Sequence, residues 1–399
     1  MNTIELSSQQ AQAAEAVRAW FSGDRQVFRL FGYAGTGKTT VAREIAEAVA
    51  PGRVAYAAFT GKAALVMQSR GCEDASTIHR LIYKPCERSG EKLRELTALL
   101  EKSPGAAALA AAVERERREV KKADYVLSDE SDARAAKLIV IDEVSMVDAK
   151  LGGDLLSFGK KVLVLGDPAQ LPPPKNGEAG FFTRDRADFL LTEIHRQAAG
   201  SPVIRLATAA REGRPLPRDG LGRSAVVPRR SMGVARMLDE HDQVICAVHR
   251  TRRPFCADSR AHLGLRGEGA LPTIGDRLIC LRNNHKLGLL NGQQWRCAGV
   301  GKVDEDVVEL SIDGEDGGHM DDVPVYRHWF EGRNDDLPAW NRKVAEEFDY
   351  AYAITCHKSQ GSQWSSVCVV DEAFGTDLEK RQWRYTAITR AAERVTVLV

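Results

Sequence analysis

The chain has 399 residues, of which 43% are hydrophobic, 28% charged and 7% aromatic, and its formal net charge is +1. A single hydrophobic core stops growing at ~250 to 300 residues, so at least two lobes are expected. No apolar run approaches the ~18 residues of a membrane span, and no signal peptide is visible, which predicts a cytoplasmic protein without a membrane partner. The eight cysteines form no CxxC pair, which argues against disulfide and zinc frameworks.

The first predicted elements are a helix, a strand and a glycine-rich loop. Apolar residues recur at helical spacing over 6–21, and 26–31 has the pattern of a short buried strand that runs into Gly32-Tyr33-Ala34-Gly35-Thr36-Gly37-Lys38-Thr39. Further strands are predicted over 54–59, 137–141 and 161–165, each followed by polar residues. This alternation predicts a parallel α/β sheet with a site at the carboxyl ends of its strands.

Two segments interrupt this α/β pattern and look inserted. Residues 84–136 change to a charged, Ala-rich helix over 91–122 and a polar stretch. After Pro174, strands predicted over 244–248, 277–281, 367–370 and 395–399 indicate a second α/β lobe. Within that lobe, short alternating strands and Asp-Gly turns after Asn291 predict a small β-barrel. The predicted divisions are a first lobe over 1–83 and 137–186 with an insert over 84–136, and a second lobe over 187–290 and 348–399 with an insert over 291–347.

The loop from Gly32 to Thr39 has the spacing of a phosphate-binding P-loop. Its glycines let backbone N–H groups close on phosphates, Lys38 can reach the β- and γ-phosphate oxygens, and Thr39 can bind magnesium. The strand before it and the helix after it are the context that this motif requires. ATP and Mg²⁺ are therefore the expected cofactors, with ATP held by Gly32, Gly35, Thr36, Gly37, Lys38, Thr39 and Thr40.

Two later strands end in groups that nucleotide hydrolysis needs. The strand over 137–141 leads into Asp142, placed to hold magnesium, and Glu143, placed to take a proton from the attacking water. Asp-Glu at a strand end is a weak signal alone, but it gains weight ~100 residues after a P-loop. The strand over 161–165 leads to Gln170, a neutral group that can sense the γ-phosphate; a Pro-rich turn is the alternative interpretation.

Two arginines of the second lobe, Arg196 and Arg390, are candidates for stabilising charge on the γ-phosphate. Phosphoryl transfer gains from positive charge at this position, and a charge supplied by another lobe makes hydrolysis depend on lobe closure. Without the motifs around them, both arginines would be interpreted as solvated surface residues.

The order of these motifs resembles that of the superfamily-1B DNA helicases, in particular the RecD-like and phage Dda-like group, over nearly the whole chain. Phe59 departs from the family pattern, which usually has proline at this position. The segments that carry the resemblance are Leu6 to Gln10, Thr60 to Ala64, Ser76 to Leu81, Asp142 to Met146, Gly166 to Pro173, Ala353 to Gly361 and Tyr385 to Arg390.

The resemblance implies two RecA-like P-loop lobes that hydrolyse ATP, translocate 5′→3′ on single-stranded DNA and unwind duplex in replication or recombination. It implies that Gln10 contacts adenine, that the 84–136 insert occupies the position of the duplex-splitting pin, and that the 291–347 insert is SH3-like. It also implies a DNA track, and the strand-end hydroxyls, N–H groups and cations there suit phosphate contacts. The residues concerned are Thr60, Lys62, Thr77, His79, Arg80, His357, Lys358, Ser359 and Gly361.

The expected partners are single-stranded DNA and forked duplex DNA, and single-strand-binding, replication or recombination proteins are further candidates. We expect the protein to be a monomer in a bacterial or phage-infected cell.

For His79 a purely structural role is an equal alternative to DNA contact. The chain ends at Val399, nine residues after Arg390, so no C-terminal partner-binding domain is expected.

Two other classes of protein remain open at this point. A small-molecule P-loop phosphotransferase would need an acceptor pocket and no second lobe with its own arginines. A non-catalytic P-loop binding module would not need Lys38, Thr39, Asp142 and Glu143 together. ATPase activity measured with and without single-stranded DNA separates the three classes.

Overall fold

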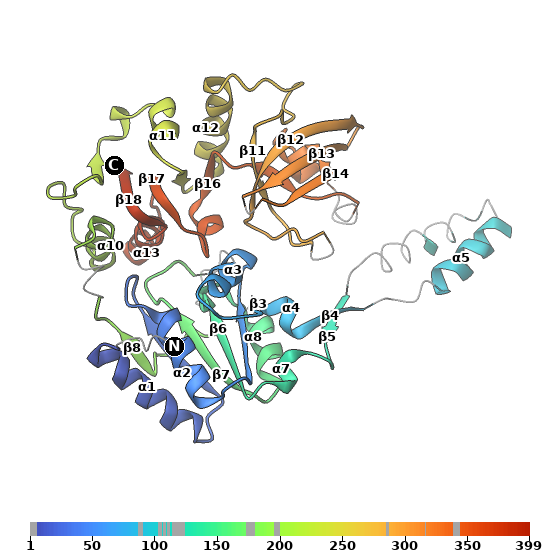
Figure 1. The fold of residues 1–399 in the computed structure, drawn as a ribbon. Helices are drawn as coiled ribbons and strands as arrows, with labels where there is room; N and C mark the ends of the chain where they lie inside the picture. Colours follow the sequence, from blue (N-terminus) through green and yellow to red (C-terminus); the bar gives the residue numbers. More distant parts are fainter. Residues whose placement is uncertain are drawn as a thin grey trace.

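The computed structural model describes residues 6–86, 91–102, 106, 109, 112–113, 124–172, 180–194, 200–284, 287–315, 317–337 and 344–399. Two α/β lobes face each other, the lower one containing the N-terminal half of the chain and the upper one the C-terminus (Figure 1). An antiparallel sheet lies beside the upper lobe, and an arm that carries one helix projects from the lower lobe. The expected division into two lobes is thus confirmed.

The first lobe is built on a six-stranded parallel sheet in the order β3-β2-β6-β7-β1-β8. Alternate residues of β6 point to opposite faces, because Leu138 and Val140 join one buried cluster whereas Ile139 and Ile141 join another. The strands predicted from the sequence are confirmed to within one residue. The strands are β1 (Val27–Gly32), β2 (Val54–Ala58), β3 (Ser76–Thr77), β6 (Leu138–Asp142), β7 (Lys161–Gly166) and β8 (Phe189–Leu191).

Helices cover both faces of this sheet. The face of Leu138 packs against α1, α2 and α3, and the face of Ile139 packs against α4, α7 and α8. The helix predicted over 6–21 begins at Ser8, where the Ser7 hydroxyl accepts a hydrogen bond from the Gln10 backbone N–H. The helices are α1 (Ser8–Phe21), α2 (Lys38–Val49), α3 (Gly61–Ser69), α4 (Ile78–Ile82), α7 (Asp132–Ala135), α8 (Ala149–Leu156) and the 3-10 turn η1 (Val144–Met146).

The arm rises on a two-stranded antiparallel stem of β4 (Tyr83–Cys86) and β5 (Asp124–Leu127). Helix α5 (Glu91–Lys102) lies far out on it, away from both lobes (Figure 1). The helix predicted over 91–122 is therefore seen over its first part, and most of its remainder lies outside the described residues. The predicted boundary at 136 is wrong, because the Ser131 hydroxyl caps α7 and donates to the Leu81 carbonyl within the lobe.

The second lobe has a five-stranded parallel sheet in the order β16-β10-β17-β18-β9. Helices α10 and α13 pack on one face, and α11 and α12 pack on the other. The elements are β9 (Ala225–Val227), β10 (Gln243–Cys246), β16 (Ala353–Thr355), β17 (Trp364–Val370), β18 (Ala391–Leu398), α10 (Pro202–Glu212), α11 (Val234–Glu240), α12 (His249–His262), α13 (Asp377–Ile388) and the 3-10 turns η2 (Arg229–Ser231) and η5 (Cys356–Ser359).

The third sheet is antiparallel, in the order β14-β13-β12-β11-β15. We expected 277–281 in the parallel sheet of the second lobe, but β11 pairs antiparallel with β12, with Leu278 opposite Trp295. The unit therefore begins before Asn291 and ends after residue 347, because β15 pairs with β11. Its elements are β11 (Arg277–Cys280), β12 (Gln294–Val303), β13 (Val307–Gly314), β14 (His319–Tyr326), β15 (Phe348–Tyr350), η3 (Arg327–Trp329) and η4 (Asn334–Asp336).

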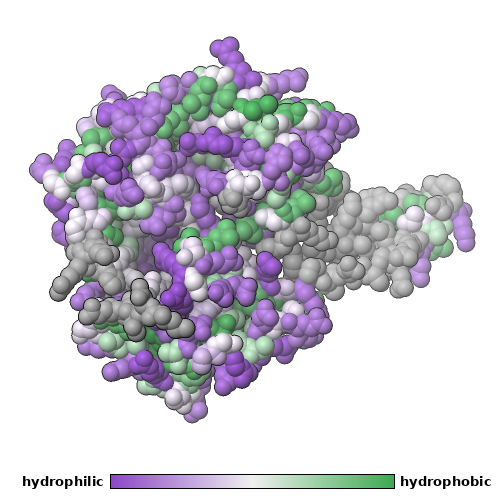
Figure 2. Space-filling view, in the orientation of Figure 1, coloured by the Kyte–Doolittle hydropathy of each residue, from purple (hydrophilic) through white to green (hydrophobic). Residues whose placement is uncertain are grey.

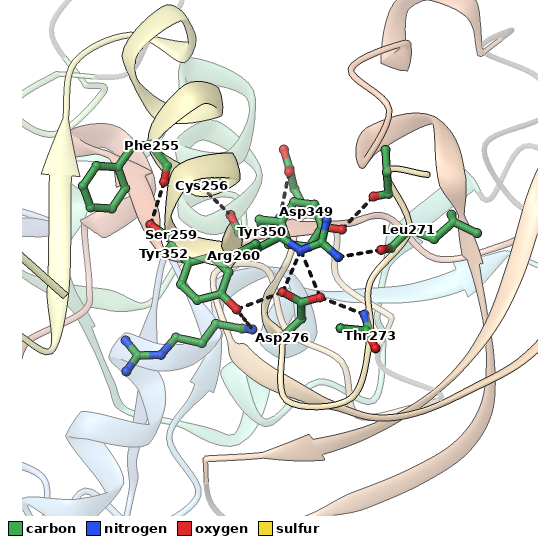
Figure 3. Close-up of polar contacts among 12 residues, drawn as sticks. Phe255, Cys256, Ser259, Arg260, Leu271, Thr273, Asp276, Asp349, Tyr350 and Tyr352 are labelled. Atoms are coloured by element: carbon green, nitrogen blue, oxygen red, sulfur yellow. Dashed lines mark hydrogen bonds and ion pairs between the residues drawn. The ribbon is translucent and has the colours of Figure 1, made fainter. Parts of the chain in front are cut away.

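A buried polar network fastens this antiparallel sheet to α12 of the second lobe (Figure 3). The carboxylate of Asp276, fully buried, accepts bonds from Arg260 Nε at 3.0 Å, the Tyr352 hydroxyl at 2.8 Å and the Thr273 N–H at 2.8 Å. A second buried ion pair joins Arg252 of α12 to Asp349 of β15. Because buried charges are stable only when they are paired and hydrogen-bonded, these contacts fix the sheet to the lobe.

Hydrophilic residues cover most of both lobes on the side shown in Figure 2, and apolar residues appear there in smaller groups. Among the described residues, no helix has both the length and the apolar character that a membrane crossing requires.

Candidate active site between the two lobes

Three predicted segments meet at one edge of the first lobe's sheet. Strands β1, β6 and β7 are neighbours and parallel, so their carboxyl ends lie together. The P-loop follows β1, Asp142 ends β6 and Glu143 follows it, and the loop with Gln170 follows β7. This is the edge at which parallel α/β sheets bind ligands.

The P-loop depends on its glycines for its shape. Gly35 and Gly37 have φ values of 81° and 72°, in the left-handed region that favours glycine. A Cβ on Gly32 would lie 2.7 Å from Thr36 Oγ1 and 2.8 Å from Leu191 Cβ. The loop leads into the N-terminus of α2, so unpaired N–H groups and the helix dipole both favour an anion there.

The Lys38 ammonium group at the start of α2 donates to the carbonyls of Gly32 at 2.6 Å and Tyr33 at 3.2 Å. Its cationic end is therefore held over the loop where phosphates would bind. Thr40, the third residue of α2, is half-buried. The structure thus brings all of the predicted ATP-binding loop residues into one cradle.

The oxygens of Thr39 and Asp142 are suited to a magnesium ion. Thr39 Oγ1 donates to Asp142 Oδ2 at 2.7 Å, so the two predicted metal ligands touch. Within the described part of the chain, no group of three His, Cys, Asp or Glu residues could hold a metal. Mg²⁺ commonly takes only one or two protein oxygens and completes its shell with phosphates and water, so this pair fits it.

Glu143 follows Asp142 with an uncommon backbone for a non-glycine residue, φ 54°. Its N–H donates to Asp142 Oδ1 at 2.7 Å. Burial raises the pKa of the Glu143 carboxyl, and the positive charge of Arg390 opposes that rise. A raised pKa suits the proton-accepting role that the sequence predicts for Glu143, and that role stays a prediction.

Gln170 is buried in the loop after β7, with 8% of its surface exposed. Its side-chain oxygen has no hydrogen-bond partner among the described residues. Because buried polar atoms are nearly always bonded, this one is available to a ligand or a water at the site.

Gln10, for which the resemblance implied adenine contact, lies against the P-loop instead of pointing to open space. It is 3% exposed and its Nε2 donates to the Thr36 carbonyl at 3.1 Å. The neighbouring Gln9 accepts from the N–H groups of Thr192 and Glu193, so Gln10 joins α1 to the P-loop and Gln9 joins it to the segment after β8. Contact of Gln10 with adenine stays a prediction.

Arg390, one of the two arginines singled out in the sequence, lies just after the C-terminal end of α13 in the second lobe. It is 6% exposed, and its guanidinium donates to the carbonyls of Thr386 and Ser362 and to the Thr389 hydroxyl. Among the described residues it has no carboxylate partner within ion-pair distance, so its charge is not neutralised by a direct ion pair. The other predicted arginine, Arg196, lies outside the described residues.

Sequence reasoning missed the contacts that join the two lobes at this site. The Tyr385 hydroxyl donates to Asp167, Thr386 Oγ1 accepts from the Leu171 N–H at 2.9 Å, and Gln360 Nε2 donates to the Leu171 carbonyl at 3.0 Å. All of these residues lie inside or beside motifs that the sequence singled out. Their pairing could not be seen, because Tyr385 and Asp167 are 218 positions apart.

The predicted DNA-facing residues of the first lobe lie at or after the carboxyl ends of β2 and β3. The hydroxyls of Thr60 and Thr77 each cap a helix, α3 and α4 respectively. Lys62 lies 4.9 Å from the centre of the Trp364 ring and 3.6 Å from Glu315 of the antiparallel sheet. His79 and Arg80 are exposed at the start of α4, and His79 lies near the Tyr83 ring.

The predicted DNA-facing residues of the second lobe lie in and after η5. Lys358 Nζ donates to Asn291 Oδ1 at 2.9 Å, and burial lowers its pKa and that of His357. Ser359 is fully buried and its hydroxyl donates to the Cys356 carbonyl, so this side chain is not available to DNA. Gly361, at φ 75°, packs against Thr60 of the first lobe, where a Cβ would lie 2.4 Å from the Thr60 hydroxyl.

Two parallel α/β lobes that meet over a P-loop, with a buried arginine supplied by the second lobe, define a two-lobe P-loop nucleotide-hydrolase fold. The chain belongs to the family of the AAA domain, whose model matches residues 5–225. Residues 350–398 match the UvrD-like helicase C-terminal domain. The first match contains the P-loop, and the second contains the motif that ends at Arg390.

The sequence predicts a resemblance to the RecD-like superfamily-1B helicases, and two relatives of this chain confirm it. The chain is 27% identical over 419 residues to the ATP-dependent RecD2 DNA helicase of Deinococcus radiodurans, covering 98% of this chain and 48% of that protein. It is also 27% identical to the RecBCD enzyme subunit RecD of Mycobacterium tuberculosis, covering 92% and 66%. The chain therefore spans about half to two thirds of the length of these relatives.

Solved structures share the fold at lower identity. The Pif1 helicase from Candida albicans has a TM-score of 0.53 at 19% identity, covering 99% of this chain and 94% of that one. Bacteroides Pif1 bound to single-stranded DNA has a TM-score of 0.52 at 17% identity, covering 99% and 92%. The two-lobe α/β fold expected from the sequence is thus confirmed.

Proposed function

We propose that this chain is an ATP-dependent DNA helicase that translocates on single-stranded DNA and unwinds duplex. The observation that carries the proposal is the position of the buried Arg390, which lies five residues after Tyr385 of the second lobe, whose hydroxyl bonds to the P-loop residue Ala34 and to Asp167 of the first lobe. Hydrolysis then requires both lobes in contact. The AAA and UvrD-like matches and the names of the relatives support the same class.

In the hydrolysis step each residue has a separate task. Lys38 and the P-loop N–H groups hold the phosphates, and Glu143 accepts the proton of the attacking water. Gln170 holds that water or the γ-phosphate through its carboxamide, whose oxygen has no partner among the residues that the structure describes, and Arg390, with Arg196 as a second candidate, stabilises the developing charge. Mg²⁺, held by Thr39 and Asp142 together with the phosphates, would supply positive charge to the phosphate oxygens.

The proposed DNA track crosses the face where residues 60–62 of the first lobe meet residues 357–361 of the second. Helix N-termini, hydroxyls and the ammonium groups of Lys62 and Lys358 suit phosphates and do not read bases. Thr77, His79 and Arg80 extend the track on the first lobe. Because the track spans both lobes, closure and reopening would shift the grip on DNA by a step.

The inserts and partners complete the proposal. The arm of β4, β5 and α5 would serve as the pin that separates strands, and the β11–β15 unit as the SH3-like barrel beside the track. We propose a cytoplasmic monomer acting 5′→3′ on single-stranded and forked DNA, with single-strand-binding or replication and recombination proteins as partners. Helix α5 supports a fork-facing role because it stands clear of both lobes (Figure 1).

The decisive experiment combines an ATPase assay with strand displacement. We expect ATP hydrolysis to rise at least about tenfold with single-stranded DNA, as charge delivery from a second lobe implies. Displacement should occur on duplexes with a 5′ tail and not on those with a 3′ tail. DNA-independent turnover with a small-molecule acceptor would favour a phosphotransferase, and nucleotide binding without turnover would favour a binding module.

A further inference from the structure

The Tyr385 hydroxyl of the second lobe contacts two loops of the first lobe, the P-loop and the loop after β7. Tyr385, on α13, is 1% exposed and its side chain reaches across the interface. Its oxygen accepts a hydrogen bond from the Ala34 N–H of the P-loop at 2.7 Å and donates one to Asp167 Oδ2 at 2.5 Å. A single atom therefore connects the P-loop, the loop after β7 and the second lobe.

The carboxylate that this hydroxyl meets has few other donors. Asp167 is 3% exposed, and its second oxygen accepts from the Ala169 N–H at 3.0 Å. Burial raises the pKa of Asp167, whereas the bond from Tyr385 opposes that rise. Burial also holds the pKa of Tyr385 well above its ordinary value, so the phenol remains a donor at neutral pH. A buried charge with few donors loses much when one is removed.

The same loop is held by the second lobe at its far end. Leu171 is bonded through its N–H to Thr386 and through its carbonyl to Gln360. Gln170, whose carboxamide oxygen has no hydrogen-bond partner in the described part of the chain, lies between Asp167 and Leu171. The second lobe thus fixes both ends of the short segment that presents Gln170.

The P-loop is held at two adjacent residues. Besides the Tyr385 bond to Ala34, the Arg211 guanidinium of α10 lies 3.7 Å from the centre of the Tyr33 ring. These residues begin the loop whose N–H groups close on phosphates. The second lobe therefore contacts the P-loop directly at both residues.

We propose that Tyr385 is a positioning residue that couples lobe closure to hydrolysis. Its hydroxyl sets the Asp167 loop against the P-loop, so that Gln170 meets the γ-phosphate or the attacking water only when the second lobe is in place. Because residues 357–361 of the same lobe belong to the proposed DNA track, the hydroxyl also links turnover to bound DNA. This proposal rests on the helicase function proposed above and adds a residue to its mechanism.

The test compares Tyr385→Phe with Tyr350→Phe. The control removes another buried hydroxyl of the second half of the chain, which donates to the Ala270 carbonyl away from the interface. With saturating single-stranded DNA, we expect Tyr385→Phe to lower kcat by about 10- to 100-fold, the range for a buried bond to a charged group. Its KM for ATP should change by less than about threefold, since Lys38 and the loop glycines remain. Tyr350→Phe should keep the wild-type kcat and its stimulation by DNA.

A double-mutant cycle distinguishes positioning from general damage. If the hydroxyl acts through Asp167, Tyr385→Phe/Asp167→Asn should have the kcat of Asp167→Asn alone. A kcat for Tyr385→Phe within about twofold of wild type, or losses that multiply in the double variant, would overturn the proposal. Should Tyr385→Phe fold poorly, Asp167→Asn with wild-type Tyr385 still tests it, because an unchanged kcat there contradicts the coupling. Failure of the helicase function itself appears separately, as absent DNA-stimulated ATPase in the wild-type chain.

Discussion

Glu143 combines a left-handed backbone with a buried carboxyl, and this combination is typical of a residue held in place for chemistry. Replacing it with glutamine keeps the shape of the side chain and removes the proton acceptor. We expect Glu143→Gln to bind ATP with near-wild-type affinity and to lose at least about 100-fold in kcat. Binding of a fluorescent ATP analogue and phosphate release measure the two effects, with Glu393→Gln on the surface as the control. If ATP binding is lost as well, the role of Glu143 is structural.

Arg390 donates to two carbonyls and a hydroxyl, so no hydrogen-bond partner among the described residues neutralises its charge, and we propose that this charge serves the nucleotide. We expect Arg390→Ala to reduce kcat by on the order of 10³-fold, the lower end for loss of an arginine finger. Arg390→Lys should recover only part of this, because an ammonium cannot reproduce the forked geometry. Turnover at saturating ATP and DNA measures the effect, and Arg223→Ala, an exposed arginine, serves as the control. Unchanged turnover in Arg390→Ala would show that the charge serves only to hold the lobe together.

The sequence predicts which kinds of residue make up the active site, but it does not predict which of them contact one another. The P-loop, Asp142 and Glu143 follow apolar strands in an order that only a parallel sheet satisfies, so their meeting could be foreseen. Tyr385 and Asp167 lie in recognisable motifs, but no local pattern states that a phenol and a carboxylate 218 positions apart share a bond. Lys358 shows the same limit, since its bond to Asn291 depends on how the two segments fold together.

At the scale of elements, long apolar strands are predictable and short paired ones are not. β6 and β7 are runs of Val, Leu and Ile that a two-faced sheet requires. β11, with four residues, has the same composition as a parallel strand, and only its pairing with β12 assigns it to the antiparallel sheet. The insert boundary near residue 136 was misplaced for a similar reason, because Ser131 belongs to the lobe through its bond to Leu81.

The arm offers a clean separation of translocation from unwinding. Its stem pairs Cys86 with Asp124, so residues 87–123 can be replaced by a two-residue Asn-Gly turn without disturbing Ser131. We expect this variant to keep DNA-stimulated ATPase and to lose strand displacement, because opening each base-pair step costs ~1.4 kcal/mol of stacking and needs a separating element. Both activities measured on one preparation decide the result. Loss of both would make the arm a scaffold, and normal unwinding would place the pin elsewhere.

At the scale of the whole molecule, the net charge is near neutral, so the proposed DNA track depends on local cations such as Lys62 and Lys358. Single-stranded DNA should therefore bind with a salt slope of about −0.7 in log K per log salt for each phosphate contacted, and with little dependence on base sequence. Fluorescence anisotropy with oligo-dT and a mixed sequence measures both. Lys62→Ala should reduce the magnitude of the salt slope by about 0.7, which is the contribution of one phosphate contact. Lys302→Ala on the antiparallel sheet should leave the slope unchanged. A slope near zero in the wild-type chain would contradict a phosphate track.

The contact of Lys62 with the Trp364 ring gives the molecule a built-in optical signal. An ammonium group near an indole alters its emission, and these two residues belong to opposite lobes. The chain has six tryptophans, so replacing the other five with phenylalanine leaves a reporter only at the interface. Stopped-flow fluorescence of that chain would follow each opening and closing of the lobes in real time, without an attached dye.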